Sequence, residues 1–384
     1  MGSRVNSELK KELKKFGANE WNECFHCGDC TAICAHTEEE VTFPRKPIRL
    51  LQMGLKDKIN SCPDPWLCYY CGTCSEKCPR NANPGELMMA MRRYLTAVYD
   101  WTGISGIFYK SCTTHIIALI ALFFAVLSAF FIWGGNMDTE LTEAGGVKLN
   151  TFAQPEMIAF LDHILLAVLS FFLLSNMVNM FYLIIIRDKS VKIPIRLYFT
   201  ELGAGIFHFI TQIKLAQCDR KKLYWFGHWF LMSAYVIMFV IIIFFLSWFQ
   251  TENIYAWYHP QRIIGYYIAA GFFFGTIYFM IGRFRKRTEY FKNSHHSDWI
   301  FIVLLFLVAL SGIAIHIFRI NGMPYATYYS YMLHLAFEVP MLVTFVAFSK
   351  WSHLAYTPFA IYLSNIKNKA RSIQSKPVYH THTE

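Results

Sequence analysis

Two cysteine runs in the first 80 residues have a spacing that suits iron–sulfur chemistry. Both follow the pattern Cys-x2-Cys-x2-Cys-x3-Cys, in which three thiolates bind one four-iron cluster and the fourth reaches a second cluster. Gly28 and Gly72 stand between the second and third cysteines, where the backbone must turn tightly around the cluster. The runs are Cys24, Cys27, Cys30 and Cys34, and then Cys68, Cys71, Cys74 and Cys78.

The pattern predicts two [4Fe–4S] clusters whose ligands are shared crosswise between the runs. Pro79 follows the second run, as is usual for this pattern, whereas Ala35 follows the first. Zinc is the main alternative, but zinc sites use two pairs of ligands and not two quartets with this spacing. The expected ligand sets are Cys24, Cys27, Cys30 and Cys78 for one cluster, and Cys68, Cys71, Cys74 and Cys34 for the other.

The other cysteines, Cys62, Cys112 and Cys218, match no ligand spacing, so we expect them to be buried, unreactive thiols. Residues 1–20 are polar and rich in lysine and lack the apolar core of a secretory signal. We therefore expect the N-terminal domain to remain in the cytoplasm. In that reducing compartment, eleven cysteines favour metal or redox chemistry over disulfide bonds.

Histidines inside apolar segments are the second group of residues that could do chemistry. Ligating side chains within membrane spans are functional candidates, and two imidazoles presented by helices can bind b-type haem. No Cys-x-x-Cys-His sequence occurs, which excludes covalently attached c-type haem. By depth, His228 and His353 should lie near the cytoplasmic surface, and His163, His316 and His334 near the outer surface.

The spacing of His334 and His353 suggests that one helix serves two haems, so we expect two haem b groups. The two residues are 19 positions apart, which is about 28 Å along an α-helix and nearly the thickness of the hydrocarbon core. In a straight helix, however, 19 steps rotate the side chain by about 100°. A kink at Pro340 or a π-bulge would be needed to restore the facing of both rings.

The composition requires a membrane domain to position these histidines. Of the 384 residues, 55% are hydrophobic and only 16% are charged, which is too apolar for an ordinary soluble protein. Apolar runs of about 20 residues, the length that crosses a bilayer, recur after the cysteine region. The expected spans are 113–133, 157–186, 224–249, 261–282, 298–318 and 330–350.

Lysine and arginine are concentrated in alternate loops, after the second span, after the fourth span and in the C-terminal tail. The positive-inside rule places these loops in the cytoplasm. Six spans then leave both termini in the cytoplasm, in agreement with the absence of a secretory signal. The net charge of +10 arises from these loops, so we expect membrane lipid and not nucleic acid as the partner of the basic residues.

We expect an all-α protein with two domains and a tail. Segments 43–60 and 85–99 have helical patterns, which indicates a helical two-cluster ferredoxin domain over residues 1–105. A six-helix transmembrane cytochrome b bundle should occupy residues 106–365, followed by a polar cytoplasmic tail at 366–384. Segment 195–217 is apolar but interrupted by charge and glycine, and it is expected to form a helix at the membrane interface.

Two resemblances support this division. The stretch from His334 through FSKWSHLAYTP at 348–358 resembles the last span of the respiratory nitrate reductase gamma subunits, which are di-haem cytochromes b. The resemblance implies haem ligation by His334, His353 and His228. Those proteins have another histidine ten residues after the equivalent of His228, but Met238 stands there in this chain. The fourth ligand is therefore left open between His163, His316 and Met238.

The N-terminal half is similar to the small iron–sulfur subunit of heterodisulfide reductase. Its fusion to a gamma-like cytochrome b, over roughly residues 20–365, resembles the C subunits of quinone-interacting membrane-bound oxidoreductase complexes. That resemblance implies menaquinone as the lipid carrier, flavin-containing soluble subunits as partners and coupling to adenylylsulfate reductase in dissimilatory sulfur metabolism.

We therefore expect the electron-transfer subunit of a quinone-reactive oxidoreductase in the cell membrane. Asp162 and Arg319, near the outer surface, are the expected quinone-binding residues. The alternatives are the membrane subunit of a heterodisulfide reductase-like or sulfite reductase-associated complex, and a membrane redox sensor. A sensor should have an output domain, for which the C-terminal tail is too short.

Overall fold

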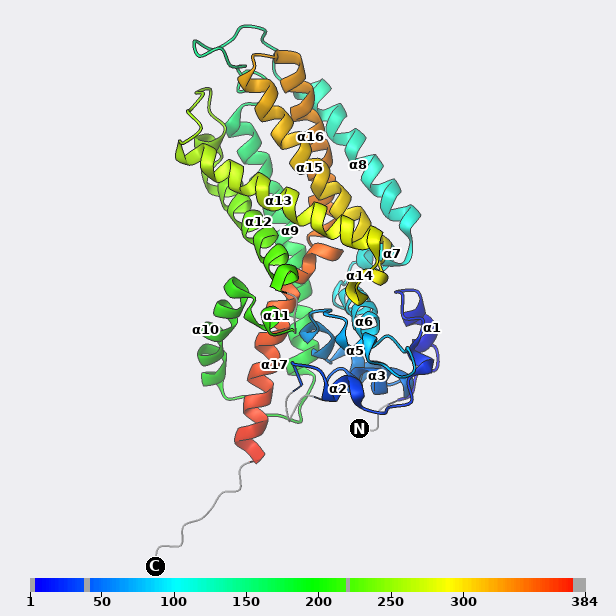
Figure 1. The fold of residues 1–384 in the computed structure, drawn as a ribbon. Coiled ribbons are helices and arrows are strands. Elements are labelled where there is room, and N and C mark those ends of the chain that lie inside the picture. Colours follow the sequence, from blue (N-terminus) through cyan, green and yellow to red (C-terminus); the bar gives the residue numbers. More distant parts are fainter. Residues whose placement is uncertain (1–3, 38–41, 219–221, 376–384) are drawn as a thin grey trace, which may run out of the picture.

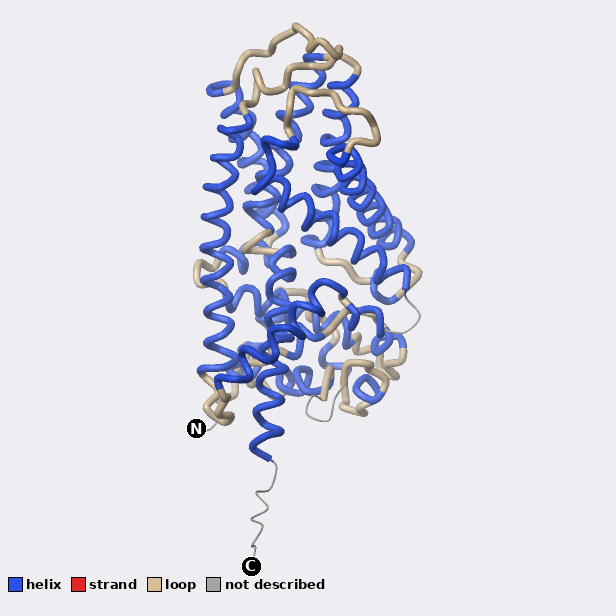
Figure 2. The backbone as a smooth tube through the Cα atoms, turned by 90° about the vertical axis from the view of Figure 1, so that its left-hand side faces the viewer, coloured by secondary structure: helices blue, strands red, loops and turns tan. Residues whose placement is uncertain are grey.

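The computed structural model describes residues 4–37, 42–218 and 222–375, and within these ranges it contains helices and loops but no strand. One isolated β-bridge joins Leu141 and Val147. The helices form two regions, a long bundle and a compact domain of short helices at one end of it (Figure 1). Tan loops close the opposite end of the bundle (Figure 2). The expected all-α fold is confirmed.

Residues 9–37 and 42–110 form the compact domain, which contains all eight motif cysteines. Expected helices at 43–60 and 85–99 are present as α3, α4 and α6. Asn83 caps α6 by accepting a hydrogen bond from the Glu86 backbone N–H. The helices are α1 Leu9–Lys14, η1 Trp21–Glu23, α2 Asp29–Ala32, α3 Arg45–Gln52, α4 Lys56–Asn60, η2 Asp64–Leu67, α5 Thr73–Glu76, α6 Pro84–Tyr99 and α7 Ile104–Lys110.

The bundle consists of six long helices, five of which are individually long and apolar enough to cross a membrane. α9 ends in a short π-helical turn, Tyr182–Ile186. The sixth, α16, meets the same test only together with the helix that follows it. The bundle helices are α8 Cys112–Trp133, α9 Pro155–Phe181, α12 Lys222–Phe249, α13 Pro260–Arg285, α15 His296–Ile320 and α16 Pro324–Phe345.

The expected last span, 330–350, is not one continuous helix. α16 ends at Phe345, η4 occupies Lys350–Ser352, and α17 (His353–Ser375) then leaves at an angle of 64° to α16. Pro340 lies within α16 and is not the break. At the break, Lys350 forms an ion pair with Asp298 in the first turn of α15. This contact between distant residues has no counterpart in the local sequence, so periodicity alone missed it.

Residues 366–375 also differ from the expected polar tail, because they continue α17. Ile366 and Ala370 are fully buried. The ammonium group of Lys367 donates to the Ile184 carbonyl at 3.0 Å and pairs with Asp188 at 2.6 Å. These contacts fasten α17 to the end of α9. The rest of the expected tail, 376–384, lies outside the described residues.

The segment expected at the interface forms α10 (Ile195–Thr211) and α11 (Ile213–Gln217). α10 packs against α17, and its contact face includes the buried Glu201, which pairs with Lys369 at 2.6 Å. The opposite face of α10 is apolar and exposed, with Phe199 and Phe207 among its side chains. Such a one-sided helix is of the kind that binds a membrane surface.

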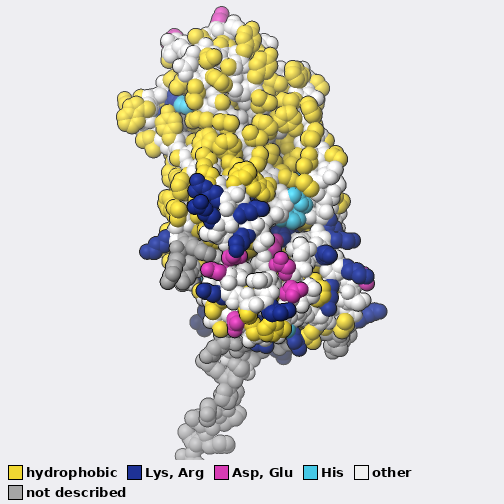
Figure 3. Space-filling model, turned by 45° about the vertical axis from the view of Figure 1, so that its right-hand side comes forward, with side chains coloured by type: hydrophobic (Ala, Val, Ile, Leu, Met, Phe, Trp, Pro, Cys, Tyr) yellow, Lys and Arg dark blue, Asp and Glu magenta, His cyan; other side chains and the backbone are white. Residues whose placement is uncertain are grey.

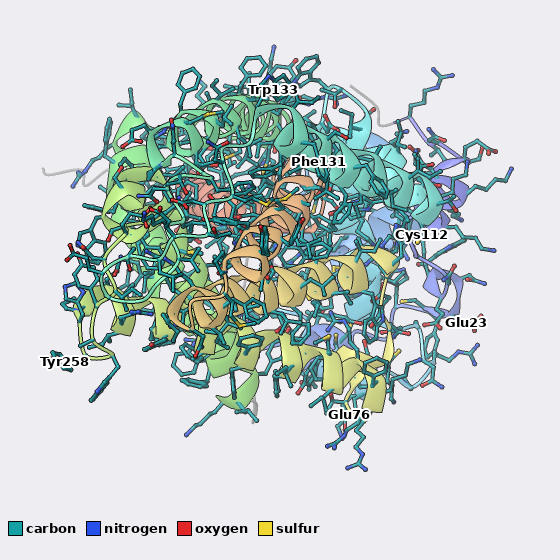
Figure 4. The ribbon with its side chains drawn as sticks, turned by 90° about the horizontal axis from the view of Figure 1, so that it is seen from above. Glu23, Glu76, Cys112, Phe131, Trp133 and Tyr258 are labelled. Carbon is teal, nitrogen blue, oxygen red and sulfur yellow. The ribbon has the colours of Figure 1, made fainter. Side chains whose placement is uncertain are left out.

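The surface of the bundle is apolar where lipid would surround it. Figure 3 shows hydrophobic side chains over the upper part of the molecule, and lysine and arginine gathered toward the end that holds the compact domain. Seen from above, Trp133 and Tyr258 lie at the rim of the molecule (Figure 4), and both are more than 60% exposed, as is Phe131. The arrangement is that of a multi-pass membrane protein with a domain at one end.

Candidate functional site

The two cysteine loops adopt the same local conformation. Gly28 precedes α2 and Gly72 precedes α5, and both are in the left-handed region, with φ of 96° and 81°. His26 and Tyr70, at equivalent positions of the two runs, also have positive φ, 64° and 52°. A left-handed backbone conformation costs free energy for any residue except glycine. Two residues in this conformation make each loop curl tightly, as it must to surround a cluster.

The two loops are interlocked, because α2 packs against α5. Cys30 interacts electrostatically with Cys24, Cys27 and Cys78, which is the first expected ligand set. In the second set, Cys74 interacts most with Cys68, Cys71 and Cys34, in that order, and more weakly with Cys30. The proximities agree with the crossed assignment, which stays a prediction about ligation.

Most of the motif cysteines are partly or fully buried, so water does little to stabilise their thiolates, and iron would have to do so. Burial raises the pKa of the Cys30 thiol to about 11 and that of Cys68 to about 12, the latter opposed by the nearby Arg92. Cluster binding must therefore release protons from these thiols. Among the described residues, no three potential ligands converge on one ion. A four-iron cluster needs no such point, because its four cysteines bind four different iron atoms.

Arg92 of α6 holds the start of the second cysteine loop by hydrogen bonds to its backbone. Its guanidinium donates to the carbonyls of Pro65 at 2.7 Å and Trp66 at 2.8 Å, and also to the carbonyl of Cys68. Because the planar guanidinium presents its donors in a rigid fork, three bonds to successive parts of the chain hold the loop in one conformation. Sequence patterns gave no indication of this role.

Residues of the bundle side contact the second loop. The Tyr69 hydroxyl lies 2.5 Å from Nε2 of His208 on α10, and the side chain of Cys71 interacts with that of Cys218, which follows α11. A Cβ on Gly72 would lie 2.6 Å from Cβ of Glu289, in α14 (Glu289–Lys292). The second cysteine run therefore faces the bundle.

The first run faces solvent instead. Cys27 is exposed, and Phe25 beside it is 61% exposed. Ile33, between the last two cysteines of the run, is 40% exposed. Exposed apolar side chains beside an expected cluster ligand are typical of a surface where another protein binds.

His228 and His353 form a pair inside the lower part of the bundle. Their ring centroids are 6.2 Å apart. Nδ1 of His228 lies 2.8 Å from Oε1 of Gln212, and Nδ1 of His353 lies 2.5 Å from the Lys350 carbonyl. Hydrogen bonding at Nδ1 leaves Nε2 as the ligating atom. With metal–imidazole bonds of about 2 Å, two rings on one metal have centroids roughly 6 Å apart, so the pair fits bis-imidazole haem.

A cavity of about 250 Å³ surrounds this pair and extends to the second cysteine run. Both histidines line it, and so does Cys68. One water occupies about 30 Å³, so the space is much larger than a solvent defect. The two histidines expected to bind the inner haem and one expected cluster ligand, Cys68, therefore line a single cavity.

His334 lies in a second cavity, of about 270 Å³, in the other half of the bundle. Its Nδ1 is 3.0 Å from Oγ of Ser311 and 3.0 Å from the Val308 carbonyl, and its Nε2, the nitrogen that remains for a ligand, lies 3.5 Å from Oε2 of Glu338. Gly312 gives the ring room, because a Cβ there would lie 3.2 Å from Cε1 of His334. Met238 and His316 also line this cavity.

The three options for the fourth ligand are placed differently. His163 is exposed on α9, lines neither cavity and has Nδ1 2.5 Å from the Ala159 carbonyl. His316 lines the second cavity but has its two ring nitrogens 2.6 and 2.7 Å from the Arg262 guanidinium. Met238 lines it from α12. The geometry favours the last two over His163.

Asp162 and Arg319 line the second cavity but do not pair with each other. Arg319 donates to the Val147 carbonyl at 3.2 Å and lies 3.9 Å from Glu252. Glu338, one turn after His334, is a further carboxylate in the wall, and it interacts electrostatically with Asp162. Sequence reasoning missed Glu338, although its spacing of four residues from His334 places it on the same helix face.

The remaining cysteines are not all buried. Cys62 and Cys218 are 4% exposed, as expected, but Cys112 is exposed, which corrects the expectation for this residue. Cys112 is the first residue of α8, directly after the Ser111 cap. Position at a helix start, outside the helix packing, explains its exposure.

Comparison with known proteins supports the first domain. Residues 20–82 match a family model described as a 4Fe-4S dicluster domain, which confirms the expectation of two [4Fe–4S] clusters. A protein of Archaeoglobus profundus, named as similar to the C subunit of heterodisulfide reductase, is 36% identical over 104 residues, 26% of this chain and 55% of that protein. The C subunit of the H(2):CoB-CoM heterodisulfide,ferredoxin reductase of Methanothermobacter marburgensis is 37% identical over 88 residues, 23% of this chain and 48% of that protein.

The C subunit of the ferredoxin:CoB-CoM heterodisulfide reductase of Methanosarcina mazei is 32% identical over 91 residues, covering 23% of this chain and 54% of that protein. The chain thus spans about half the length of the curated relatives that it matches. No solved structure matches the chain. The chain therefore contains an iron–sulfur electron-transfer domain related to the C subunits of heterodisulfide reductases, joined to a bundle of membrane-length helices.

Proposed function

We propose that the chain conducts electrons between a membrane quinone and a soluble partner, through two b haems in the bundle and two [4Fe–4S] clusters in the compact domain. When bound, these groups store and exchange single electrons. The observation that most supports the proposal is the first cavity, which is lined both by His228 and His353 and by Cys68. Two proposed haem ligands and one proposed cluster ligand thus line the same space.

The two cysteine sets have different positions in the proposed path. The set of Cys68, Cys71, Cys74 and Cys34 lies against the bundle, as the contact between Tyr69 and His208 indicates. The set with Cys27 reaches solvent, beside the exposed Phe25. The set that contains Cys68 is therefore assigned to exchange electrons with the inner haem, and the set that contains Cys27 to exchange them with the soluble partner.

In the inner haem site, His228 and His353 are the proposed axial ligands. Gln212 and the Lys350 carbonyl hold the ring orientations through Nδ1. Second-sphere bonds of this kind fix the tautomer of a ligating histidine. The break after α16 is essential to this geometry, because His353 is the first residue of a new helix and need not share a face with His334.

In the outer haem site, His334 is proposed as one ligand and either His316 or Met238 as the other, since both line the same cavity. The quinone is proposed to bind beside this cavity, near Asp162 and Arg319. A quinol that gives up two electrons also releases two protons. The carboxylates of Asp162 and Glu338 are the groups in the wall that can accept them.

The proposed location is the cell membrane, with the compact domain and both termini in the cytoplasm. Lysine and arginine gather at the end of the bundle that holds the compact domain (Figure 3). This distribution is what the positive-inside rule expects for a cytoplasmic face. The apolar face of α10 would then contact the inner surface of the bilayer.

The specific assignment we propose is the C subunit of a quinone-interacting membrane-bound oxidoreductase complex. It would use menaquinone and flavin-containing soluble subunits, with adenylylsulfate reductase as the terminal partner. A second assignment, the membrane subunit of a heterodisulfide reductase-like complex, is favoured by the relatives named for that activity. Purification of the complex from its native membrane, followed by identification of the co-purifying subunits, separates the two.

The test of the function is a redox titration of the purified chain by optical and electron paramagnetic resonance spectroscopy. The expected result is two low-spin b haems and two [4Fe–4S] clusters, all reduced by a menaquinol analogue in sequence. A chain with the clusters but without haem would contradict the proposal. The matched variants His228→Ala and His163→Ala add a control, because only the first should remove a haem.

A further inference from the structure

The wall of the first cavity has two chemically distinct ends. The end within the bundle is apolar, with side chains such as Met232, Phe301 and Leu305. The end beside the compact domain contains all the charged side chains of the wall. They are contributed by α6, by the end of α13, by the first turn of α15 and by the break before α17, and they are Glu86, Arg92, Arg93, Arg283, Asp298 and Lys350.

The charges at this end do not balance. Four of the six residues are cations and two are carboxylates, and one of the cations, Arg92, interacts with the Cys68 thiol of the same wall. The carboxylates are already paired, Glu86 with Arg93 at 2.6 Å and Asp298 with Lys350. In the second cavity, by contrast, Arg262 and Arg319 face Asp162 and Glu338, and the wall is neutral. Buried unpaired charge is costly, so an excess of this kind requires an anion.

Arg283 is the cation with the least satisfied side chain. Its Nε is buried and has no hydrogen-bond partner among the described residues. Its charge acts on Asp298 together with those of Lys350 and Arg93, so three cations surround one carboxylate. Arg92, in contrast, has its donors occupied by three backbone carbonyls.

We infer that Arg283, assisted by Lys350, binds the two propionate groups of the inner haem, which therefore point toward the iron–sulfur domain. The inference rests on the proposed haem at His228 and His353. A porphyrin with an apolar ring and a dicarboxylate edge matches the two ends of the cavity. Its carboxylates would neutralise Arg283, which forms no ion pair with the carboxylates of the wall. The cationic end places this edge of the haem beside the Cys68 loop.

The test compares Arg283→Gln with Arg283→Lys and with Arg285→Gln in the purified full-length protein, and its readout is the midpoint potential of each haem. Arg285 is the matched control, because it is exposed on the same last turn of α13. Removing a positive charge beside the propionates disfavours reduction. Arg283→Gln should lower the potential of one haem by about 59 mV, a tenfold change in its one-electron equilibrium. Arg283→Lys and Arg285→Gln should stay close to the unchanged protein.

Each outcome is decisive. If Arg283→Gln loses one haem and Arg283→Lys retains it, the inference is also supported, because the positive charge is then what binds the propionates. Loss from both variants, or no shift in Arg283→Gln, overturns it. A shift in a cluster potential with unchanged haem potentials also overturns it, since Arg283 would then serve the cluster. If the unchanged protein contains no haem, the proposed function itself fails.

Discussion

Nε2 of His36 lies 3.0 Å from Sγ of Cys218, although the two residues are 182 positions apart in the sequence. His36 follows the first cysteine run, and Cys218 follows α11 in the segment between the second and third long helices. Cys218 also hydrogen-bonds to the side chain of Cys71. The connection between two long helices thus reaches the ligands of a predicted cluster, so the compact domain is seated on the bundle by specific contacts.

The first prediction concerns thiol reactivity. The hydrogen bond to Cys71 and burial both raise the pKa of the Cys218 thiol far above its ordinary value. Alkylation requires the thiolate, so Cys218 should stay unmodified at pH 8 in the folded, cluster-loaded protein. Cys112, which is exposed, should react at least tenfold faster with iodoacetamide. Peptide mass spectrometry after timed quenching measures both rates, and equal rates would show that the contact with Cys71 does not form.

The second prediction uses the two equivalent glycines. Both have positive φ, so alanine strains the backbone at either position by about 1 kcal/mol. A Cβ on Gly28 meets only the end of the Arg45 side chain at 3.5 Å, whereas a Cβ on Gly72 would lie 2.6 Å from Cβ of Glu289. Gly72→Ala should therefore also push the second loop away from α14.

The measurement is the rate of cluster reduction by quinol in the purified variants. Gly28→Ala should keep the rate within about twofold, because its clash is slight. Gly72→Ala should slow it by tenfold or more, since tunnelling depends steeply on separation, while the haem spectra stay unchanged. Equal rates in the two variants would mean that the contact with α14 does not position the cluster assigned to the Cys68 loop.

The third prediction separates the options for the outer haem. We expect His334→Ala to remove one haem and leave the inner haem intact. His316→Ala and Met238→Ala should be compared directly, because only one of these residues can be the second ligand. A change from low-spin to high-spin haem identifies it. His163→Ala should leave both haems unchanged, since this side chain is exposed and lines neither cavity.

Local patterns predicted the parts of this protein that depend on local geometry. The cysteine spacing led directly to the two loops, because a cluster imposes its dimensions on neighbouring residues. Position along the spans led us to expect His228 and His353 at the same depth, and their ring centroids are 6.2 Å apart in the structure. The direction in which a side chain points could not be predicted in this way, since each step of one residue along a helix rotates it by about 100°. His163 was therefore a candidate by expected depth alone, and in the structure its side chain is exposed.

Tertiary contacts account for what the sequence could not reveal. The break after Phe345 coincides with the ion pair of Lys350 with Asp298, which are far apart in the chain. Arg92 was indistinguishable from any arginine on an amphipathic helix until its three carbonyl partners were seen. Cys218 matched no motif, because its contacts with His36 and Cys71 span most of the chain.

The fourth prediction concerns Arg92. Replacement by lysine keeps the charge but loses the fork that joins the Pro65, Trp66 and Cys68 carbonyls. Arg92→Lys should lower the content of the cluster assigned to Cys68, Cys71, Cys74 and Cys34 by half or more. Iron per chain and electron paramagnetic resonance measure this content. Arg80→Lys is the matched control, because Arg80 is exposed beside Glu23. A full complement of iron in Arg92→Lys would show that charge alone suffices.

The last prediction concerns the pH dependence of stability at the end of α9. Burial raises the pKa of Asp188, but hydrogen bonds from Lys367 and Ser190 outweigh it and hold the pKa below the ordinary range. The folded protein therefore binds fewer protons here than the unfolded chain does. The resulting stabilisation is complete above a pH of about 4, the ordinary value for aspartate, and it is lost as the pH falls further toward the pKa of the folded state.

Asp188→Asn should therefore lower the free energy of unfolding at pH 7 by about 1 kcal/mol, a figure reduced for solvent screening because the carboxylate is partly exposed. The difference from the unchanged protein should shrink as the pH is lowered below about 4. Asp57→Asn is the control, since Asp57 pairs with Arg187 at the surface, at 2.9 Å with both side chains over 40% exposed. Its effect should stay below about 0.5 kcal/mol. Thermal unfolding in detergent at pH 7 and pH 3 measures both, and a pH-independent loss in Asp188→Asn would point to packing instead of charge.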